Sequence, residues 1–142
     1  MSLRQASAVA IGGRALLIEG SPGSGKSSLA LVLIDRGATL IGDDGVSLTE
    51  RDGALWASPP PNTAGQIELR NVGLVALATT RAPVALVLAL DEGAPRFVEQ
   101  AESIEIGGHA IPRLAFDPRG PAAVVRAEYA LALHGLPLSR TA

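Results

Sequence analysis

The segment that most constrains the fold of this chain is a glycine-rich turn, GSPGSGKS, at residues 20–27. It matches the pattern G-x-x-x-x-G-K-S/T at every fixed position and lies between two apolar runs, residues 15–18 and 29–34. This pattern in this context is typical of a phosphate-binding loop (P-loop) that joins a β-strand to an α-helix. The alternative is a glycine-rich turn with a solvated lysine. We adopt nucleotide binding as the prediction, because both the motif and its flanks fit.

The residue types of the loop match the chemistry of a triphosphate. Glycine lets the main chain turn tightly enough to point several N–H groups at one anion. Lys26 supplies a positive charge to the outer phosphates, and the Ser27 hydroxyl is a ligand for Mg²⁺. The N-terminus of the following helix adds a partial positive charge. The expected nucleotide-binding residues form one consecutive run: Gly20, Ser21, Pro22, Gly23, Ser24, Gly25, Lys26, Ser27 and Ser28.

Length and composition indicate the type of core. A chain of 142 residues is long enough for one core but not for two, so we predict a single domain over residues 1–142. The chain is 47% hydrophobic but only 3% aromatic, so Ala, Val, Leu and Ile must build the core. Such a core favours an α/β layer structure.

Charge and residue usage exclude several classes of function. The net charge of −2 provides no electrostatic footprint for nucleic acid or an anionic membrane, so neither is an expected partner. The absence of cysteine excludes disulfides and thiol chemistry, and two isolated histidines make no metal pair. No apolar run reaches the roughly 18 residues of a membrane span, and the first residues lack a secretory signal. We therefore expect a soluble, cytoplasmic protein.

Periodicity and turn residues predict an alternation of strands and helices. Hairpins are expected around Gly12-Gly13 and around residues 51–53, and antiparallel hairpins make a wholly parallel sheet implausible. The helix after the loop has almost no polar face, so we expect it to be buried on most sides and to end at Gly37. Strands 72–77 and 84–90 are expected in the interior. The remaining expected elements are strands 8–11, 15–18, 39–41, 45–49, 54–57 and 66–70, a hairpin over 103–112 leading into 113–116, and helices 27–36 and 122–134.

Charged residues follow or occupy two of these strands. Asp43 and Asp44 stand at the C-terminal end of strand 39–41, and ligands of α/β sheets bind at the carboxyl ends of strands. Alternation in strand 66–70 puts Glu68 and Arg70 on one face. Phosphoryl transfer needs a metal, a basic side chain and a carboxylate that accepts a hydroxyl proton, and all three types are available here. A solvated turn and a surface ion pair are the alternatives.

The order and spacing of three segments resemble the C-terminal kinase domain of bacterial HPr kinase/phosphorylase, in its short single-domain form. The segments are GSPGSGKSSLAL, LIDRGATLIGDD and GQIELRNVGLVAL, within roughly the first half of the chain. The resemblance implies a mixed α/β sheet with a P-loop, in a fold related to that of phosphoenolpyruvate carboxykinase. It also implies an ATP-dependent protein-serine kinase, with phosphorylase activity in the reverse direction.

The resemblance assigns roles to single residues. Asp43 would be the base toward a protein serine and the acid in the reverse reaction, with Lys26 and Arg70 acting on phosphate. Ser27, Asp44 and Glu68 would surround Mg²⁺. The implied cofactors are ATP and Mg²⁺. The implied partners are an HPr-like phosphocarrier protein of phosphotransferase regulation and further copies of the chain, since the family forms hexamers.

The chain departs from the family pattern at three positions. Gln5 stands where the family has a functional histidine, Ser28 replaces an acid and Asn71 replaces a glycine. Because glutamine cannot carry the charge of an imidazole, these changes bear on phosphoryl transfer more than on nucleotide binding. Two alternatives stay open. One is an ATP-binding regulatory or sensor module with impaired transfer, and the other is a small-molecule kinase or NTPase, which explains the acid pair poorly.

Overall fold

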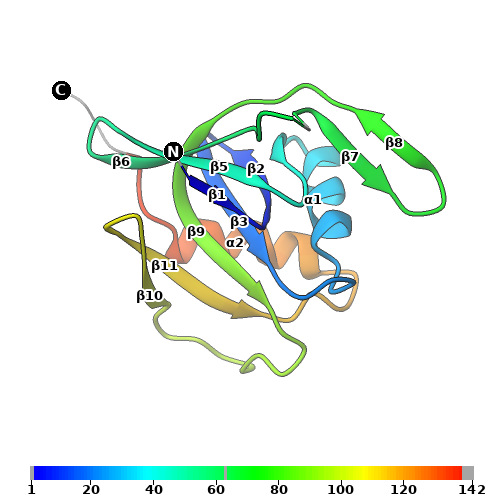
Figure 1. Ribbon diagram of the computed structural model, residues 1–142. Helices are drawn as coiled ribbons and strands as arrows, with labels where there is room; N and C mark the ends of the chain where they lie inside the picture. The colour runs from blue at the N-terminus through cyan, green and yellow to red at the C-terminus, as the bar shows by residue number, and fades with distance from the viewer. Residues whose placement is uncertain (1, 63, 139–142) are drawn as a thin grey trace.

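A computed structural model describes residues 2–62 and 64–138 of the chain (Figure 1). Two helices accompany a nine-stranded mixed sheet and a separate two-stranded ribbon in these residues. The elements in chain order are β1 (Ser2–Arg4), β2 (Ser7–Ile11), β3 (Arg14–Glu19), α1 (Lys26–Asp35), β4 (Thr39–Gly42), β5 (Val46–Arg51), β6 (Ala54–Ser58), β7 (Gln66–Leu69), β8 (Gly73–Ala76), β9 (Ala82–Leu90), β10 (Glu102–Ile106), β11 (His109–Phe116) and α2 (Ala123–His134).

Strand β9 is the centre of the large sheet. It runs parallel to β3 on one side and to β11 on the other, and it pairs antiparallel with the end of β6. The order across the sheet is β1-β5-β6-β9-β3-β2-β4, with β11 and β10 branching from β9. The hairpins β2–β3, β5–β6 and β10–β11 are antiparallel. The predicted mixed α/β sheet is therefore confirmed, because these hairpins coexist with the parallel β3–β9 pair.

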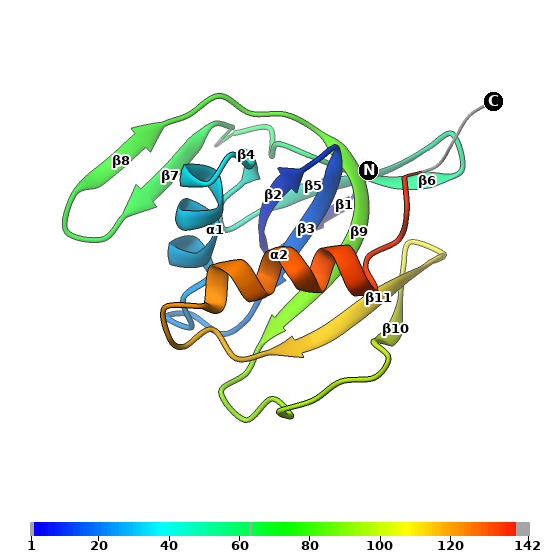
Figure 2. The ribbon, with the colours of Figure 1, turned by 180° about the vertical axis from the view of Figure 1, so that it is seen from behind.

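The core forms on both faces of the sheet, because successive side chains of a strand point to opposite faces. In β3, Leu16 and Ile18 pack with the helices, while Leu17 packs on the other face with residues of β5, β6 and β11. Both helices lie on one face, as Figure 2 shows. The second face is covered by the curl of the sheet itself. Strand β9 contributes to both clusters, which explains its nearly continuous apolar sequence.

Helix α1 is less buried than its sequence suggests. Leu29, Ala30 and Leu33 are buried against the sheet, but Val32 is 42% exposed. The expectation of burial on most sides is wrong, because Ser28, Val32 and Asp35 leave one side of the helix exposed. The predicted helix end is confirmed: Gly37 has φ 115, in the left-handed region that glycine tolerates.

Strand β8 is not an interior strand. It pairs only with β7, and the two form a ribbon that projects beside α1 in Figure 1. Leu74 within β8 is 69% exposed, and Val72 in the preceding turn is 74% exposed. A short apolar run has the same appearance whether or not the fold covers it, so the expectation of an interior strand over 72–77 is wrong.

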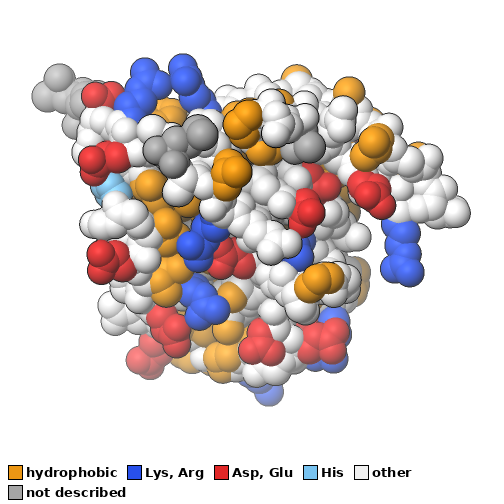
Figure 3. Space-filling model, viewed as in Figure 1, with side chains coloured by type: hydrophobic (Ala, Val, Ile, Leu, Met, Phe, Trp, Pro, Cys, Tyr) orange, Lys and Arg blue, Asp and Glu red, His pale blue; other side chains and the backbone are white. Residues whose placement is uncertain are grey.

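Acidic, basic and apolar side chains are interspersed on the surface seen in Figure 3. Charge on this face is therefore mixed in sign.

Of the helices that the described residues form, neither has the length and apolarity needed to cross a membrane.

Candidate functional site

The P-loop connects β3 to α1, and its glycines meet two different needs. Gly23 and Gly25 have φ 80 and φ 104, which side chains disfavour. Gly20 is needed for space, because a Cβ at this position would lie 2.5 Å from Ser24 Oγ. The motif thus encodes a tight turn that leads directly into the first residue of α1.

The N-terminus of α1 is open to an anion. Its N-cap is Gly25, which provides no side-chain hydrogen bond, and the first turn contains no acidic residue. The first N–H groups of a helix have no partner within the helix, and they carry partial positive charge. Ser24 Oγ is buried and has no hydrogen-bond partner among the described residues. Together these groups suit a bound phosphate.

Lys26 adds a full positive charge to the loop. Its Nζ donates hydrogen bonds to the carbonyl oxygens of Gly20, at 2.9 Å, and Ser21, at 3.2 Å. The ammonium group therefore lies over the loop itself. A phosphate bound by the loop would be within its reach.

Asp43 is held by three donors from three parts of the chain. Its Oδ1 accepts the hydroxyl of Ser27 at 2.6 Å and that of Ser7 at 3.0 Å. Its Oδ2 has a longer contact, 3.4 Å, with the backbone N–H of Glu68. An ionised carboxylate has about four acceptor positions, so Oδ2 retains capacity while Oδ1 is anchored. Asp43 is thus fixed beside the hydroxyl predicted to bind the metal.

Asp44 points elsewhere. Its φ of 61 is in the left-handed region, and the turn is so tight that a Cβ on Gly42 would lie 2.2 Å from the carbonyl oxygen of Gly45. The exposed Asp44 lines a hollow of about 520 Å³ together with Gln5. The predicted metal set joined Ser27 to Asp44, but the contact in the structure joins Ser27 to Asp43.

Glu68 lies within strand β7, and Arg70 lies just beyond its end. Strand β7 ends at Leu69, and Arg70 lies in the turn of the β7–β8 ribbon before Asn71, whose φ is 65. The structure brings Glu68 to Asp43 through its backbone, while the side chains of Glu68 and Arg70 are exposed. Arg70 therefore lies one residue beyond the strand in which it was expected, and the common face remains a prediction.

Sequence reasoning missed Ser7 and the pair of Arg4 with Glu19. Ser7 is fully buried in β2 and donates to Asp43. Arg4 forms a salt bridge with Glu19, the residue directly before the P-loop. The only available signal for Ser7 was a hydroxyl at the start of an apolar strand. Nothing in the spacing connects it to a residue 36 positions later.

The carboxyl ends of β9 and β11 carry a charged cluster on the other side of the loop. The Arg119 side chain donates to the Asp117 carboxylate at 3.0 Å and to the Glu92 carbonyl oxygen at 3.0 Å. The hydrogen bond from Arg119 lowers the pKa of Asp117 from 3.8 to about 2, and the same pairing raises the pKa of Arg119. The cluster joins the segment after β9 to the segment after β11.

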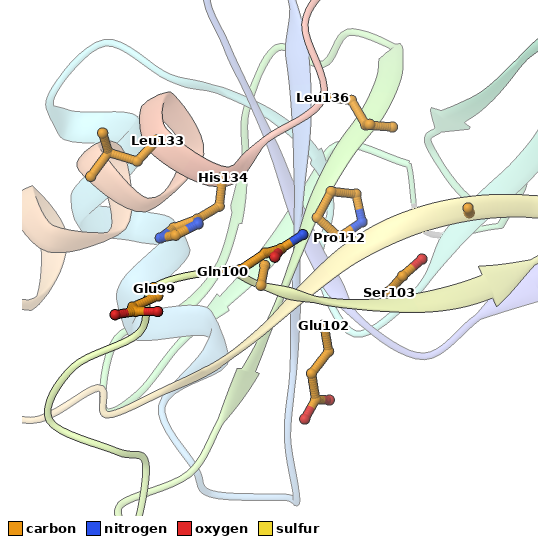
Figure 4. A pocket seen from close by; sticks show the side chains of 10 residues that line it. Glu99, Gln100, Glu102, Ser103, Pro112, Leu133, His134 and Leu136 are labelled. Carbon is orange, nitrogen blue, oxygen red and sulfur yellow. The ribbon is translucent and has the colours of Figure 1, made fainter.

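Other hollows lie away from the P-loop. One of about 400 Å³ is formed by the end of α2, the start of β10 and β11 (Figure 4). Leu133 and His134 enter from the helix, and Glu99 and Gln100 from the segment before β10. None of its lining residues belongs to the expected site. Over the described parts of the chain, no three His, Asp or Glu side chains gather as a metal-binding group.

Comparison with known proteins gives a consistent result. Residues 2–81 match the family model described as HPr Serine kinase C-terminal domain. An HPr kinase/phosphorylase of Clostridium botulinum is 46% identical over 67 residues, which cover 47% of this chain and 22% of the relative. One from Streptococcus thermophilus is 34% identical over 120 residues, covering 75% of this chain and 39% of the relative. The chain thus spans well under half the length of these relatives.

A solved structure shares the fold. The Hpr(Ser) kinase/phosphatase from Coxiella burnetii superposes with a TM-score of 0.76 over 93% of each chain, at 24% sequence identity. The mixed sheet is therefore a known arrangement.

Proposed function

Because the chain belongs to the HPr serine kinase C-terminal domain family, we propose that it is an ATP-dependent protein-serine kinase acting on HPr or a related phosphocarrier. Phosphorolysis of the phosphoserine would be the reverse reaction at the same site, and residues 1–142 would act as one P-loop domain. The observation that carries the proposal is the hydrogen bond from Ser27 to Asp43, 2.6 Å, beside the open N-terminus of α1. It joins a carboxylate to the hydroxyl expected at the metal.

ATP and Mg²⁺ fit the residues present. The uncapped helix, the buried Ser24 hydroxyl and Lys26 suit a triphosphate. Mg²⁺ is usually held by one or two protein ligands together with phosphates and water, so a site without an acid cluster suits it. We assign Ser27 and Glu68 as ligands, with Asp44 as a third candidate on the strength of the family pattern alone. The ion would neutralise charge on the outer phosphates.

Asp43 would act on the proton of the acceptor. As the serine oxygen bonds to the γ-phosphorus and the bond to the ADP oxygen breaks, Oδ2 takes the hydroxyl proton. Oδ1 stays bound to Ser7 and Ser27, which keeps the carboxylate in one orientation. In the reverse reaction the same oxygen returns the proton to the leaving serine. Lys26 and Arg70 would stabilise phosphate charge, Arg70 from the turn of the ribbon.

Self-association is a further part of the proposal. Apolar side chains are exposed on the β7–β8 ribbon at Val72 and Leu74, and on α2 at Tyr129 and Leu133. Exposed apolar surface of this kind favours contact between proteins. Light scattering of the purified chain would measure the assembly; a monomer at every concentration would contradict this part.

The decisive experiment incubates the chain with ATP, Mg²⁺ and a bacterial HPr. Phosphoserine on HPr, detected by mass spectrometry, is the expected result. Lys26→Ala serves as the inactive control, since it removes the charge at the phosphates. ATP binding without transfer would contradict kinase activity, and transfer only to a small molecule would contradict the protein acceptor.

Gln5 favours a second candidate function, an ATP-binding regulatory module with impaired transfer. Gln5 is exposed and lines the hollow with Asp44, where it can neither carry a charge nor shuttle a proton. Gln5→His separates the two functions, because it restores the family residue. A variant that transfers phosphate where the natural chain does not would establish the regulatory module.

A further inference from the structure

A hollow adjoins the P-loop on the side away from Asp43. It has a volume of about 360 Å³ and lies between loop residues 21–24 and residues 90–92, with Pro118 at its edge. Strand β3 has β9 on one side and β2 and β4 on the other. Asp43 follows β4 and Asp91 follows β9, so the two acids flank the loop from opposite sides.

This placement matches the path of a nucleotide through the loop. Ser27 would hold the Mg²⁺ that neutralises charge on the outer phosphates, so these phosphates would lie toward Ser27 and Asp43. The α-phosphate and the nucleoside must then leave the loop on the β9 side. Small-molecule pockets have volumes of about 300–1,000 Å³, so this hollow has room for one such group.

The lining is mostly polar and includes two acidic residues, Asp91 and Glu92, which suits the hydroxyls of a sugar. Pro22, Leu90 and Pro118 provide apolar surface, and Ser24 brings its unpartnered buried hydroxyl. Asp91 is held in place, since its Oδ1 accepts the N–H of Gly93 at 2.8 Å. A carboxylate accepts several hydrogen bonds, and the adjacent 2′- and 3′-hydroxyls of a ribose are donors that match it.

We propose that this hollow is the nucleoside subsite and that the Asp91 carboxylate binds the ribose hydroxyls. The inference rests on the proposed function, because the phosphates must first occupy the P-loop. It adds a specificity-determining residue, directly after β9, that selects ribonucleoside triphosphates over inorganic polyphosphate. Arg119 donates a hydrogen bond to the Glu92 carbonyl oxygen beside the hollow.

The test is calorimetric titration of the full chain with the Mg²⁺ complexes of ATP, 2′,3′-dideoxy-ATP and tripolyphosphate. We expect the natural chain to bind ATP about tenfold more tightly than dideoxy-ATP, the effect of one hydrogen bond to a charged group. In Asp91→Asn, the affinity for ATP should fall about tenfold, and the affinity for each of the other two ligands should fall at most about twofold. Asp52→Asn is the matched control: it removes the same charge from an exposed turn at φ 53, which asparagine tolerates, and should change nothing.

Three results would overturn the inference and leave the proposed function standing. Equal affinities for ATP and dideoxy-ATP in the natural chain would remove the ribose contact, without reliance on any variant. The role of Asp91 would be refuted if Asp91→Asn bound ATP with the affinity of the natural chain. It would also be refuted if the affinities for ATP and tripolyphosphate fell by the same factor. Failure of the natural chain to bind any of the three ligands would instead overturn the proposed function and the subsite with it.

Discussion

Substitution of Asp43 by asparagine separates its chemical role from its structural one. The amide oxygen can still accept the hydroxyls of Ser7 and Ser27, which approach Oδ1 at 3.0 and 2.6 Å. The amide nitrogen then replaces Oδ2 and faces the backbone N–H of Glu68, 3.4 Å away in the natural chain. Two donors face each other there, so this contact is lost while the anchoring of the other oxygen survives.

The structure indicates how much stability and how much transfer rate the substitution should cost. Two charge-assisted hydrogen bonds become neutral ones, and a charge-assisted bond is worth about 1.5–3 kcal/mol against about 1 for a neutral bond. We therefore expect the free energy of unfolding to fall by about 1–4 kcal/mol, measured by urea denaturation. An amide cannot accept the proton of the acceptor serine, so transfer should slow by about 10²- to 10⁴-fold, the range of general-base catalysis. Mg·ATP affinity should change much less.

The assay is single-turnover transfer from radiolabelled ATP to HPr, with calorimetry of Mg·ATP in parallel. Asp44→Asn is the neighbouring comparison. As a metal ligand, Asp44 would be replaced by a weaker one in this variant, so added Mg²⁺ should restore part of the variant's activity. Added Mg²⁺ should not change the activity of Asp43→Asn. Transfer by Asp43→Asn at the natural rate, with ATP binding intact, would refute the assignment of Asp43 as base. The three hydrogen bonds would then serve only to position Ser27.

Three further predictions concern binding, packing and pH. Lys26→Ala should abolish high-affinity Mg·ATP binding in calorimetry and leave the circular dichroism spectrum unchanged, because the ammonium lies over the loop and not in the core; an unchanged Kd would contradict the P-loop assignment. Leu33→Ala should lower the free energy of unfolding by about 3 kcal/mol, since Leu33 is fully buried, whereas Val32→Ala on the exposed side should cost less than about 1 kcal/mol; equal losses would contradict the packing. Arg119 lowers the pKa of Asp117 to about 2, below its ordinary 3.8, so the carboxylate stabilises the fold above about pH 4 and this contribution disappears as the pH falls through 2. The stability difference between the natural chain and Asp117→Asn should therefore be constant above about pH 5 and shrink below about pH 4; a difference that grows in acid would contradict the pairing.

The local sequence determined the phosphate loop and several of the turns, strands and helix ends of this protein. The P-loop is encoded by glycines at positions that need φ above zero or no Cβ, a requirement within eight consecutive residues. The hairpins, the strand before Asp43 and the helix end at Gly37 follow from alternation and turn residues in the same way. Each of these features depends on neighbours in the chain, so the residue pattern alone predicts it.

Only the tertiary structure decided which groups meet. Asp43 and Asp44 are equivalent in sequence, but Asp43 bonds to Ser7 and Ser27, whereas Asp44, at φ 61, lines a hollow with Gln5. Ser7 reaches Asp43 because β2 lies between β3 and β4. Likewise, the hollow by Asp91 exists because β9 borders β3 in parallel. These contacts join residues far apart in the chain, and their free energy depends on strand order and register, which no local pattern contains.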